Sequence, residues 1–298
     1  MPLLSICMVS LDCWDILKDC IDSLKTTQGD ISYEIIIVDN ASSDNTPERI
    51  KSEFSDIQLI ENQHNVGFTK ATNQAIERSR GSYILWLNTD TILRPDTLSK
   101  LICFMDENPR VGIVGPKVLN LDGTFQPQCR RGLPTPLASF CYLLKLDRFF
   151  PRSRIAGQYL LTHLPVDAPN PVDSVSGCCL LTRRIVCDDI GPLDETFFGF
   201  GEDLDWCLRA KKKGWEVWYF PGSEVTHLKG KGGVHTKPYH KVWGIHQAMW
   251  LFYQKHLSST YPGFVNGMVW LAIIGSSILS GTKVFLSQII QKSLHRFT

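Results

Sequence analysis

The fold of this chain is decided by residues 35–40, which read IIIVDN. Four consecutive apolar residues are typical of a strand that is buried on both faces. Asp39 and Asn40 follow at the point where that strand would end. Because ligands of open α/β sheets gather at the carboxyl ends of the strands, this segment predicts a parallel sheet with a polar binding edge. Asp39 is the first candidate there, as an acceptor for an N–H group of a nucleobase, and Asn40 can add a second contact.

The same pattern extends over about residues 1–117. Apolar runs separated by longer, helix-like stretches lie at 5–9, 33–38, 57–60, 83–87 and 111–114. Helix starts are expected at 44–48, where Pro47 suits the first turn, and at 96–105 after Pro95. This alternation predicts βαβ units and a parallel sheet.

Residues 118–171 break that pattern. Asp122-Gly123 is typical of a hairpin turn, and seven prolines exclude a long helix: Pro127, Pro134, Pro136, Pro151, Pro165, Pro169 and Pro171. We therefore expect residues 118–171 to form a variable insertion outside the core, an excursion from the βαβ pattern. Beyond it we expect a strand at 172–181, a helix at 203–213, a strand at 215–220 and a helix from about 239 to 256.

The segment 264–282 has 19 residues and no charge. At about 1.5 Å per residue, such a helix nearly matches a hydrocarbon core of roughly 30 Å. Its second half is two-sided, with serines on one face and leucines on another, and Lys283, Lys292 and Arg296 follow. We expect a helix at a membrane surface or inserted in it. The alternative is a helix packed on the domain or on a second subunit.

Composition places this chain among ordinary globular proteins. Hydrophobic residues make up 43% and charged residues 20%, and the net charge of +1 disfavours a nucleic-acid binder, which usually carries a basic excess. The ten cysteines include no CxxC pair and no zinc-finger spacing. Because residues 3–9 already resemble a strand, we expect no signal peptide, and we expect reduced thiols in a cytosolic compartment.

Two segments provide candidate metal ligands. Asn88-Thr89-Asp90 follows the apolar run 83–87, and Mg²⁺ or Mn²⁺ on a diphosphate takes one or two protein carboxylates. Asp90 fits that need, with Asn88 as its neighbour, although Asn and Asp are also common at simple turns. His227 precedes the basic, glycine-rich loop 229–237. It is either a structural histidine or a second ligand, with the loop closing over a diphosphate.

The sequence Glu202-Asp203-Leu204-Asp205 opens a helix. Acidic residues are favoured in a first turn by the helix dipole, which is the structural alternative. However, they follow the aromatic, glycine-rich residues 197–201, and a carboxylate in such a pocket can deprotonate a hydroxyl group. We choose Asp203 as the general base, and we expect Asp205 to pair with a nearby Arg or Lys.

Taken in order, these segments resemble the family 2 glycosyltransferases, inverting enzymes with a GT-A fold, and more narrowly their rhamnosyltransferase-like branch. The resemblance runs from about Ser5 to His227. The matching stretches are SICMVS (5–10), VDNASSDNT (38–46), NVGF (65–68) with Asn73, LNTD (87–90), VSG (175–177), GPLDETFF (191–198), EDLD (202–205) and PGSEVTH (221–227).

The resemblance implies a role for each candidate. Asp203 would be the catalytic base, and Asp90 and His227 would hold Mg²⁺ or Mn²⁺. The donor-binding residues would be Asp39, Asn40, Asn65, Gly67, Lys70 and Asn88. Two of the departures from the family pattern lie near the donor. Asp12 stands where Asn is frequent and adds a charge near the nucleotide, and Lys70 replaces a small residue, so that it either contacts phosphate or covers the surface.

The prediction is a metal-dependent inverting transferase. Residues 1–238 would form a GT-A domain, with a donor-binding half at about 1–117 and an acceptor-binding, catalytic half at about 172–238. Residues 239–298 would form a helical, membrane-associated region, which could also pair two copies of the chain. The donor would be dTDP-rhamnose or a UDP-hexose. The acceptor would be lipid-linked or a polysaccharide, at the inner face of the cell membrane.

Two other functions compete with this prediction. A sugar nucleotidyltransferase should show a glycine-rich, basic triphosphate loop, and residues 3–13 contain none. A non-catalytic binding subunit would have lost the carboxylates at positions 90 and 203, and both are present.

Overall fold

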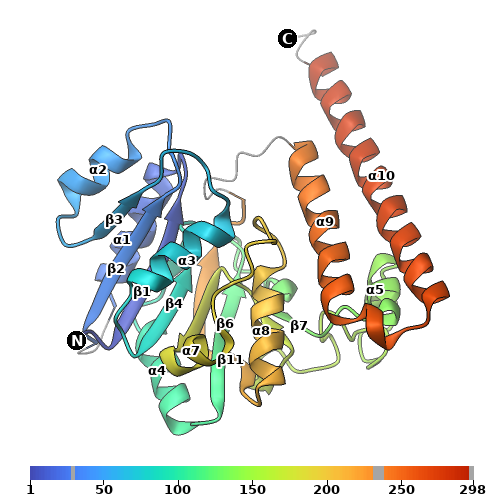
Figure 1. The fold of residues 1–298 in the computed structure, drawn as a ribbon, viewed down its shortest axis with the longest axis horizontal. Coiled ribbons are helices and arrows are strands. Elements are labelled where there is room, and N and C mark those ends of the chain that lie inside the picture. Colours follow the sequence, from blue (N-terminus) through green and yellow to red (C-terminus); the bar gives the residue numbers. More distant parts are fainter. Residues whose placement is uncertain (28–30, 231–237, 295–298) are drawn as a thin grey trace. The chain divides into compact units, whose positions relative to one another are not determined.

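The computed structural model describes residues 1–27, 31–230 and 238–294, without the side chains of 238 and 289–294 (Figure 1). The chain divides into two compact units. The first consists of Met1–Glu195 and Glu202–Val234, and the second of Thr196–Gly201 and His235–Thr298.

Nine of the strands in the described residues form one sheet in the first unit, in the order β3-β2-β1-β4-β10-β6-β11-β5, with β8 beside β11. Strands β1 to β4 are parallel, β10 is antiparallel to both β4 and β6, and β11 is parallel to β6. The bounds are β1 (Leu4–Ser10), β2 (Tyr33–Asp39), β3 (Gln58–Glu61), β4 (Tyr83–Leu87), β5 (Thr91–Leu93), β6 (Val111–Leu119), β8 (Asn170–Pro171), β10 (Cys179–Arg183) and β11 (Glu216–His227). The expected α/β fold with a mainly parallel sheet is confirmed.

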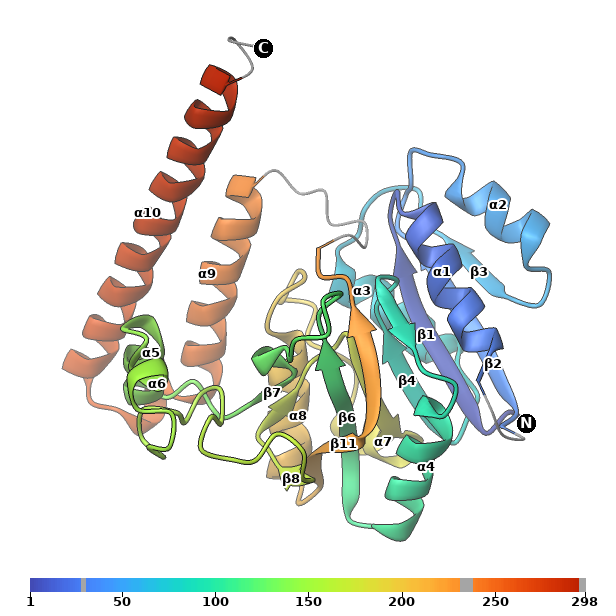
Figure 2. The same cartoon turned by 180° about the vertical axis from the view of Figure 1, so that it is seen from behind.

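Helices cover both faces of this sheet. α3, α7 and α8 lie over one face, and α1 and α4 lie over the other (Figures 1 and 2). The helix bounds in this unit are α1 (Trp14–Lys25), α2 (Thr46–Glu53), α3 (Phe68–Arg78), α4 (Thr97–Glu107), α5 (Pro136–Leu143), α6 (Leu146–Phe149), α7 (Arg184–Ile190) and α8 (Glu202–Lys212). Ile36, Ile37 and Val38 are fully buried between these layers, as the apolar run of β2 predicts.

The expected strand at 172–181 is broken in two. Ser174–Val175 forms β9, which pairs with β7 (Arg130–Arg131), and β10 begins only at Cys179. Gly177 lies in the turn between them, where an added Cβ would lie 2.6 Å from the Trp86 ring. The apolar pattern could not show this turn, because the close approach to Trp86 depends on β4.

The excursion at 118–171 contains the expected hairpin turn. Gly123 has φ +79°, its N–H donates to Asn120 O over 2.9 Å, and Leu119 pairs with Phe125. A 3₁₀ turn (Pro127–Cys129), α5 and α6 follow. Both of these helices are short, as the prolines predict.

The second unit is a helical hairpin of α9 (Pro238–His256) and α10 (Gly263–Leu294), joined through the 3₁₀ turn Ser258–Thr260. His246 Nε2 lies 3.1 Å from Ser276 Oγ and ties the two helices together. Within the described residues, one helical segment, Gly263–Gln288, is long and apolar enough to cross a membrane, and none of its most apolar window is buried. Length and composition alone are weak evidence for a membrane span.

Candidate active site

The nucleotide end of the candidate site lies where β1 and β2 end side by side. Ser10 and Asp39 are register partners in these parallel strands. Asp39 Oδ1 accepts hydrogen bonds from Ser10 Oγ at 3.0 Å and Ser42 Oγ at 2.5 Å, and Oδ2 accepts from the Ser42 N–H at 2.9 Å. A carboxylate offers about four lone pairs, so this fixed group retains capacity for one more donor.

The structure brings Asn40, Asn65 and Gly67 together in one network. Asn40 Nδ2 donates to Asn65 Oδ1 over 2.9 Å, and the same oxygen accepts from the Gly67 N–H at 2.9 Å. Gly67 has φ +93°, a conformation that favours glycine, immediately before α3. Lys70 is exposed in the first turn of that helix. In this arrangement Asn40 holds the loop before α3 in place, because both the nitrogen and the oxygen of its side-chain amide form hydrogen bonds with protein groups.

Asp12 also has a structural task. Its φ is +47°, and its Oδ1 accepts from the N–H groups of Ser43 at 2.6 Å and Asp44 at 3.2 Å. It therefore joins the loop after β1 to the loop after β2.

The two predicted metal ligands meet at the other end of the site. Thr91 in β5 pairs with His227 in β11, which places His227 beside Asp90. His227 Nε2 lies 3.1 Å from Asp90 Oδ1, and Asp90 is buried. Asp90 Oδ2 also accepts from the Gly230 N–H at 3.1 Å. Residues 231–237 of the predicted glycine-rich loop lie outside the described part of the chain.

The surroundings of this pair fit a divalent cation. Gln126 Nε2 donates to His227 O over 2.8 Å, so its Oε1 faces His227 Nδ1 at 3.2 Å and accepts a hydrogen bond from the Nδ1–H group. That contact leaves Nε2 toward Asp90, the usual arrangement of a metal-bound histidine. Asn88 Oδ1 is buried and has no hydrogen-bond partner within the described part of the chain. No group of three or more His, Cys, Asp or Glu in the described residues is arranged to hold a metal ion by itself, so phosphate and water oxygens would complete the coordination.

The predicted base accepts three hydrogen bonds, one of them from the Leu204 N–H to Asp203 Oδ1 at 2.7 Å. Asp203 Oδ2 accepts from Arg131 Nη2 at 2.6 Å and from the Gly177 N–H at 3.0 Å. Arg131 also donates to Ser174 Oγ and Val175 O, both at 3.0 Å. The carboxylate therefore has a fixed direction and a counter-charge.

Glu202 precedes the base and behaves differently. Burial, and then the charge of Asp203, raise the pKa of Glu202 to about 8. Its Oε2 is buried without a hydrogen-bond partner among the described residues. Asp205, in contrast, forms the expected ion pair, with Arg209 Nε at 2.9 Å.

One turn connects the predicted base to the two predicted metal ligands. Gly177 donates to Asp203, and the next carbonyl, Cys178 O, accepts from the Asn88 N–H at 3.0 Å and from Thr91 Oγ1 at 3.1 Å. Asn88 and Thr91 flank Asp90 in sequence. The structure therefore joins Asp203, Asp90 and His227, which lie far apart along the chain, around residues 177–178.

Sequence reasoning missed two supporting side chains. Arg131 stood out only as half of a basic pair, and Gln126 gave no signal. Neither lies in one of the short stretches on which the family resemblance was recognised, and each contacts a partner that is distant in sequence. Arg131 lies 72 residues from Asp203, and Gln126 lies 101 residues from His227.

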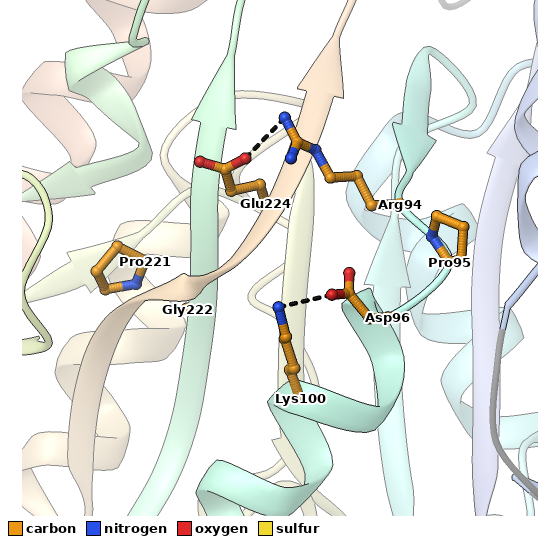
Figure 3. Close-up of a pocket in the computed structure, with 7 residues that line it drawn as sticks. All are labelled: Arg94, Pro95, Asp96, Lys100, Pro221, Gly222 and Glu224. Carbon is orange, nitrogen blue, oxygen red and sulfur yellow. Dashed lines mark ion pairs between the residues drawn. The ribbon is translucent and has the colours of Figure 1, made fainter.

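A cavity of about 390 Å³ lies elsewhere on the first unit, lined by Arg94, Pro95, Asp96, Lys100, Pro221, Gly222 and Glu224 (Figure 3). Arg94 pairs with Glu224 at 2.7 Å, and Lys100 pairs with Asp96 at 2.6 Å. These charges already satisfy one another, and no predicted site residue lines the cavity. We therefore assign the reaction to the strand ends and not to this cavity.

Comparisons with known proteins identify the family and the fold of this chain. The family model Glycosyl transferase family 2 matches residues 5–187. An N-acetylglucosaminyl-diphospho-decaprenol L-rhamnosyltransferase of Mycobacterium tuberculosis (strain H37Rv) is 29% identical over 206 residues, which are 65% of this chain and 66% of that protein. The low-salt glycan biosynthesis hexosyltransferase Agl10 of Haloferax volcanii is 28% identical over 187 residues, 60% of this chain and 54% of that one. The match to the first relative thus spans just under two thirds of its length.

Solved structures show the same fold. Staphylococcus aureus TarS 1–349 in complex with UDP-GlcNAc aligns with a TM-score of 0.54 at 14% identity, over 92% of this chain and 72% of that one. The mannosyltransferase PcManGT from Pyrobaculum calidifontis, in complex with GDP-Man and Mn²⁺, aligns with a TM-score of 0.58 at 13% identity, over 98% and 80%. At such identities the likeness concerns the fold alone.

Proposed function

Because the chain belongs to glycosyl transferase family 2, we propose that it is an inverting glycosyltransferase that moves a sugar from a nucleoside-diphosphate donor to a hydroxyl group of an acceptor. One observation carries this proposal. The carboxylate of Asp203 and the Asp90–His227 pair are both held around the turn at residues 177–178. A general base and a diphosphate site belong on either side of a sugar carbon that is attacked.

The reaction would be a single displacement. Asp203 accepts the proton of the acceptor hydroxyl as its oxygen attacks the anomeric carbon. The bond from that carbon to the donor phosphate breaks, and its electron pair leaves with the nucleoside diphosphate. One displacement inverts the configuration, and no nucleophile on the protein is required.

Asp90 and His227 would hold the cation, with Gln126 orienting the histidine ring. Bound Mg²⁺ or Mn²⁺ would neutralise charge on the leaving diphosphate. The fold neighbour that contains Mn²⁺ supports a divalent ion without choosing between the two metals. Asn88 supports the same site through its unpartnered Oδ1, and Lys70 would contact phosphate oxygens.

The donor would carry a pyrimidine base. Asp39 can accept the imide N–H that uracil and thymine share, while Asn40, Asn65 and Gly67 shape the loop beside it. The name of the mycobacterial relative favours rhamnose as the sugar and a lipid-linked N-acetylglucosamine as the acceptor. The name of the haloarchaeal relative, a hexosyltransferase, supports a hexose as the second candidate for the transferred sugar.

The placement in the cell follows from that acceptor. Residues 1–238 would form the transferase domain, with its donor half before about 117 and its acceptor half after about 172. Residues 239–298 would associate with the inner face of the cell membrane, and α10 is the apolar helix that supports this assignment. Pairing of two copies through the same helices is the alternative.

The test is release of nucleoside diphosphate from dTDP-rhamnose, UDP-glucose, UDP-galactose and GDP-mannose, with and without Mn²⁺ or Mg²⁺, in the presence of a lipid-diphospho-N-acetylglucosamine acceptor. Asp203→Asn and Asp90→Asn should each abolish turnover. Asp122→Asn, in the exposed turn, is the matched control and should leave the rate unchanged.

Other outcomes separate the competing functions. Binding of a donor without turnover in the wild type would indicate a non-catalytic subunit. Formation of a nucleotide-sugar and pyrophosphate from a sugar phosphate and a nucleoside triphosphate would indicate a nucleotidyltransferase.

A further inference from the structure

The segment 137–155, which carries α5 and α6, forms an unusual surface of the first unit (Figure 2). We refer to it as the 137–155 surface. Six of its large apolar side chains are each more than half exposed: Leu137, Phe140, Leu144, Phe149, Phe150 and Ile155. Soluble monomers rarely expose so many large apolar side chains in one short segment without a binding role.

The inner side of the same segment is already packed. Ala138, Cys141 and Asp147 are buried, and the ring of Tyr142 contacts that of Tyr159 at 4.9 Å. Thr135 Oγ1 accepts the Ala138 N–H at 3.2 Å and caps α5. The exposed apolar side chains are therefore additional to those that pack this segment against the first unit.

The charges on this surface have one sign. Lys145, Arg148, Arg152 and Arg154 are exposed, while Asp147, the one acid between 136 and 155, is 7% exposed. Exposed aromatic and aliphatic groups interleaved with basic residues suit a bilayer interface, where rings enter the acyl boundary and cations meet anionic headgroups.

We propose that the 137–155 surface docks on an anionic lipid bilayer, separately from α10. The proposal draws on the proposed function in one respect, since a lipid-linked acceptor would be presented at that bilayer. The segment also begins near the reaction site. Arg131, which pairs with the base Asp203, lies five residues before Pro136. Docking would therefore fix the distance of the Asp203 carboxylate from the lipid headgroups and its orientation toward them.

The test places an environment-sensitive fluorophore on the surface of the full-length chain. Cys103 is the exposed cysteine among the ten, so Cys103→Ser provides a background for Phe149→Cys. Leu121→Cys is the matched control, because Phe149 and Leu121 are both 74% exposed in the first unit. Each labelled protein is bound to vesicles of phosphatidylcholine with and without phosphatidylglycerol, and quenching by brominated lipid is compared with quenching by iodide in the water.

On anionic vesicles the probe at 149 should be quenched by brominated lipid and protected from iodide, whereas the probe at 121 should show the reverse. Arg148→Gln with Arg152→Gln should return the 149 probe to water even if α10 keeps the protein on the vesicle. At roughly 1 kcal/mol per basic residue, the equilibrium constant for docking should fall about 30-fold.

Two results would overturn the proposal. A 149 probe that stays accessible to iodide on bound protein would show that the surface does not dock. Protection without vesicles that increases with protein concentration would assign the surface to a second copy of the chain. No donor is present in this assay, and turnover of the same samples is measured separately. Failure of docking is therefore distinct from failure of the transferase assignment.

Discussion

Arg131 Nη2 lies 2.6 Å from Asp203 Oδ2, in an ion pair between residues 72 positions apart. Both side chains are mostly buried. Burial opposes the charge of Arg131, but the Asp203 carboxylate raises its pKa overall. Arg131 is therefore a positioning residue that gives the proposed base a counter-charge and a fixed direction.

Arg131→Met should lower kcat by about 10²- to 10³-fold, comparable to the loss of a general base, with a smaller effect on the KM for the donor. Arg131→Lys should recover part of the rate, because an ammonium group restores the counter-charge. Nucleoside diphosphate release over a range of donor concentrations measures kcat and KM for both variants. Arg110→Met removes a surface ion pair with Glu216 and serves as the control. An unchanged kcat in Arg131→Met would contradict the positioning role.

Gly177→Ala should disturb both stability and catalysis. The new Cβ would lie 2.6 Å from the Trp86 ring. Relieving that overlap would move the backbone N–H of residue 177, which donates a hydrogen bond to Asp203. Overpacking in a core costs about 1–3 kcal/mol, so thermal unfolding should shift down and kcat should fall. Gly275→Ala is the control, because nothing lies within 4 Å of its added Cβ. Equal behaviour of the two variants would show that the turn at 177 tolerates a side chain.

Glu202→Gln should change how stability depends on pH. Because burial and Asp203 raise the pKa of Glu202 from 4.5 to about 8, the folded protein binds a proton there that the unfolded chain has lost. The Glu202 contribution to the free energy of unfolding therefore falls as the pH rises from about 4.5 to 8. Relative to wild type, Glu202→Gln should gain stability across that window and match it below pH 4.5. Thermal denaturation of both proteins from pH 4 to 8.5 is the measurement, and a constant difference would refute it.

Gln126→Leu should weaken cation binding without removing a ligand. Gln126 holds the His227 ring through Nδ1 and the His227 carbonyl. Loss of such a partner typically lowers metal affinity about 10- to 100-fold. Titration of Mn²⁺ in the presence of a nucleoside diphosphate, followed by electron paramagnetic resonance, would detect this. Asn120→Ala, at the nearby exposed turn, should leave the affinity unchanged.

Thiol reactivity should single out one cysteine. Burial raises the pKa of Cys129 to about 11 and those of Cys178 and Cys207 to about 12, whereas Cys103 is exposed. Because the thiolate is the reactive form, a thiol reagent at pH 8 should modify about one group in the native protein and all ten after denaturation. Cys103→Ser should remove the fast-reacting group, and fast modification of several thiols would disagree with the packing described.

Much of the parallel half of the fold could be predicted from the sequence, because its signals are local. The apolar run before Asp39 requires a buried strand, and Tyr83–Leu87 is observed with the bounds expected for it. The pairing of Asp205 with Arg209 also lies within one helical turn and could be anticipated. Such features depend on residues a few positions apart, so the spacing of apolar and charged residues along the sequence is enough to predict them.

Tertiary structure alone decided how the site is assembled. The break at Gly177 follows from the nearby Trp86 ring, and the unexpected strand β5 exists because β11 continues to His227 and pairs with it. Arg131 and Gln126 act on partners 72 and 101 residues away. No local pattern encodes such pairs, because each contact depends on how distant elements pack. The sequence by itself determined which carboxylates are present and which strands carry them. Folding decided that Arg131 and Gly177 lie beside Asp203, and that Gln126 lies beside His227.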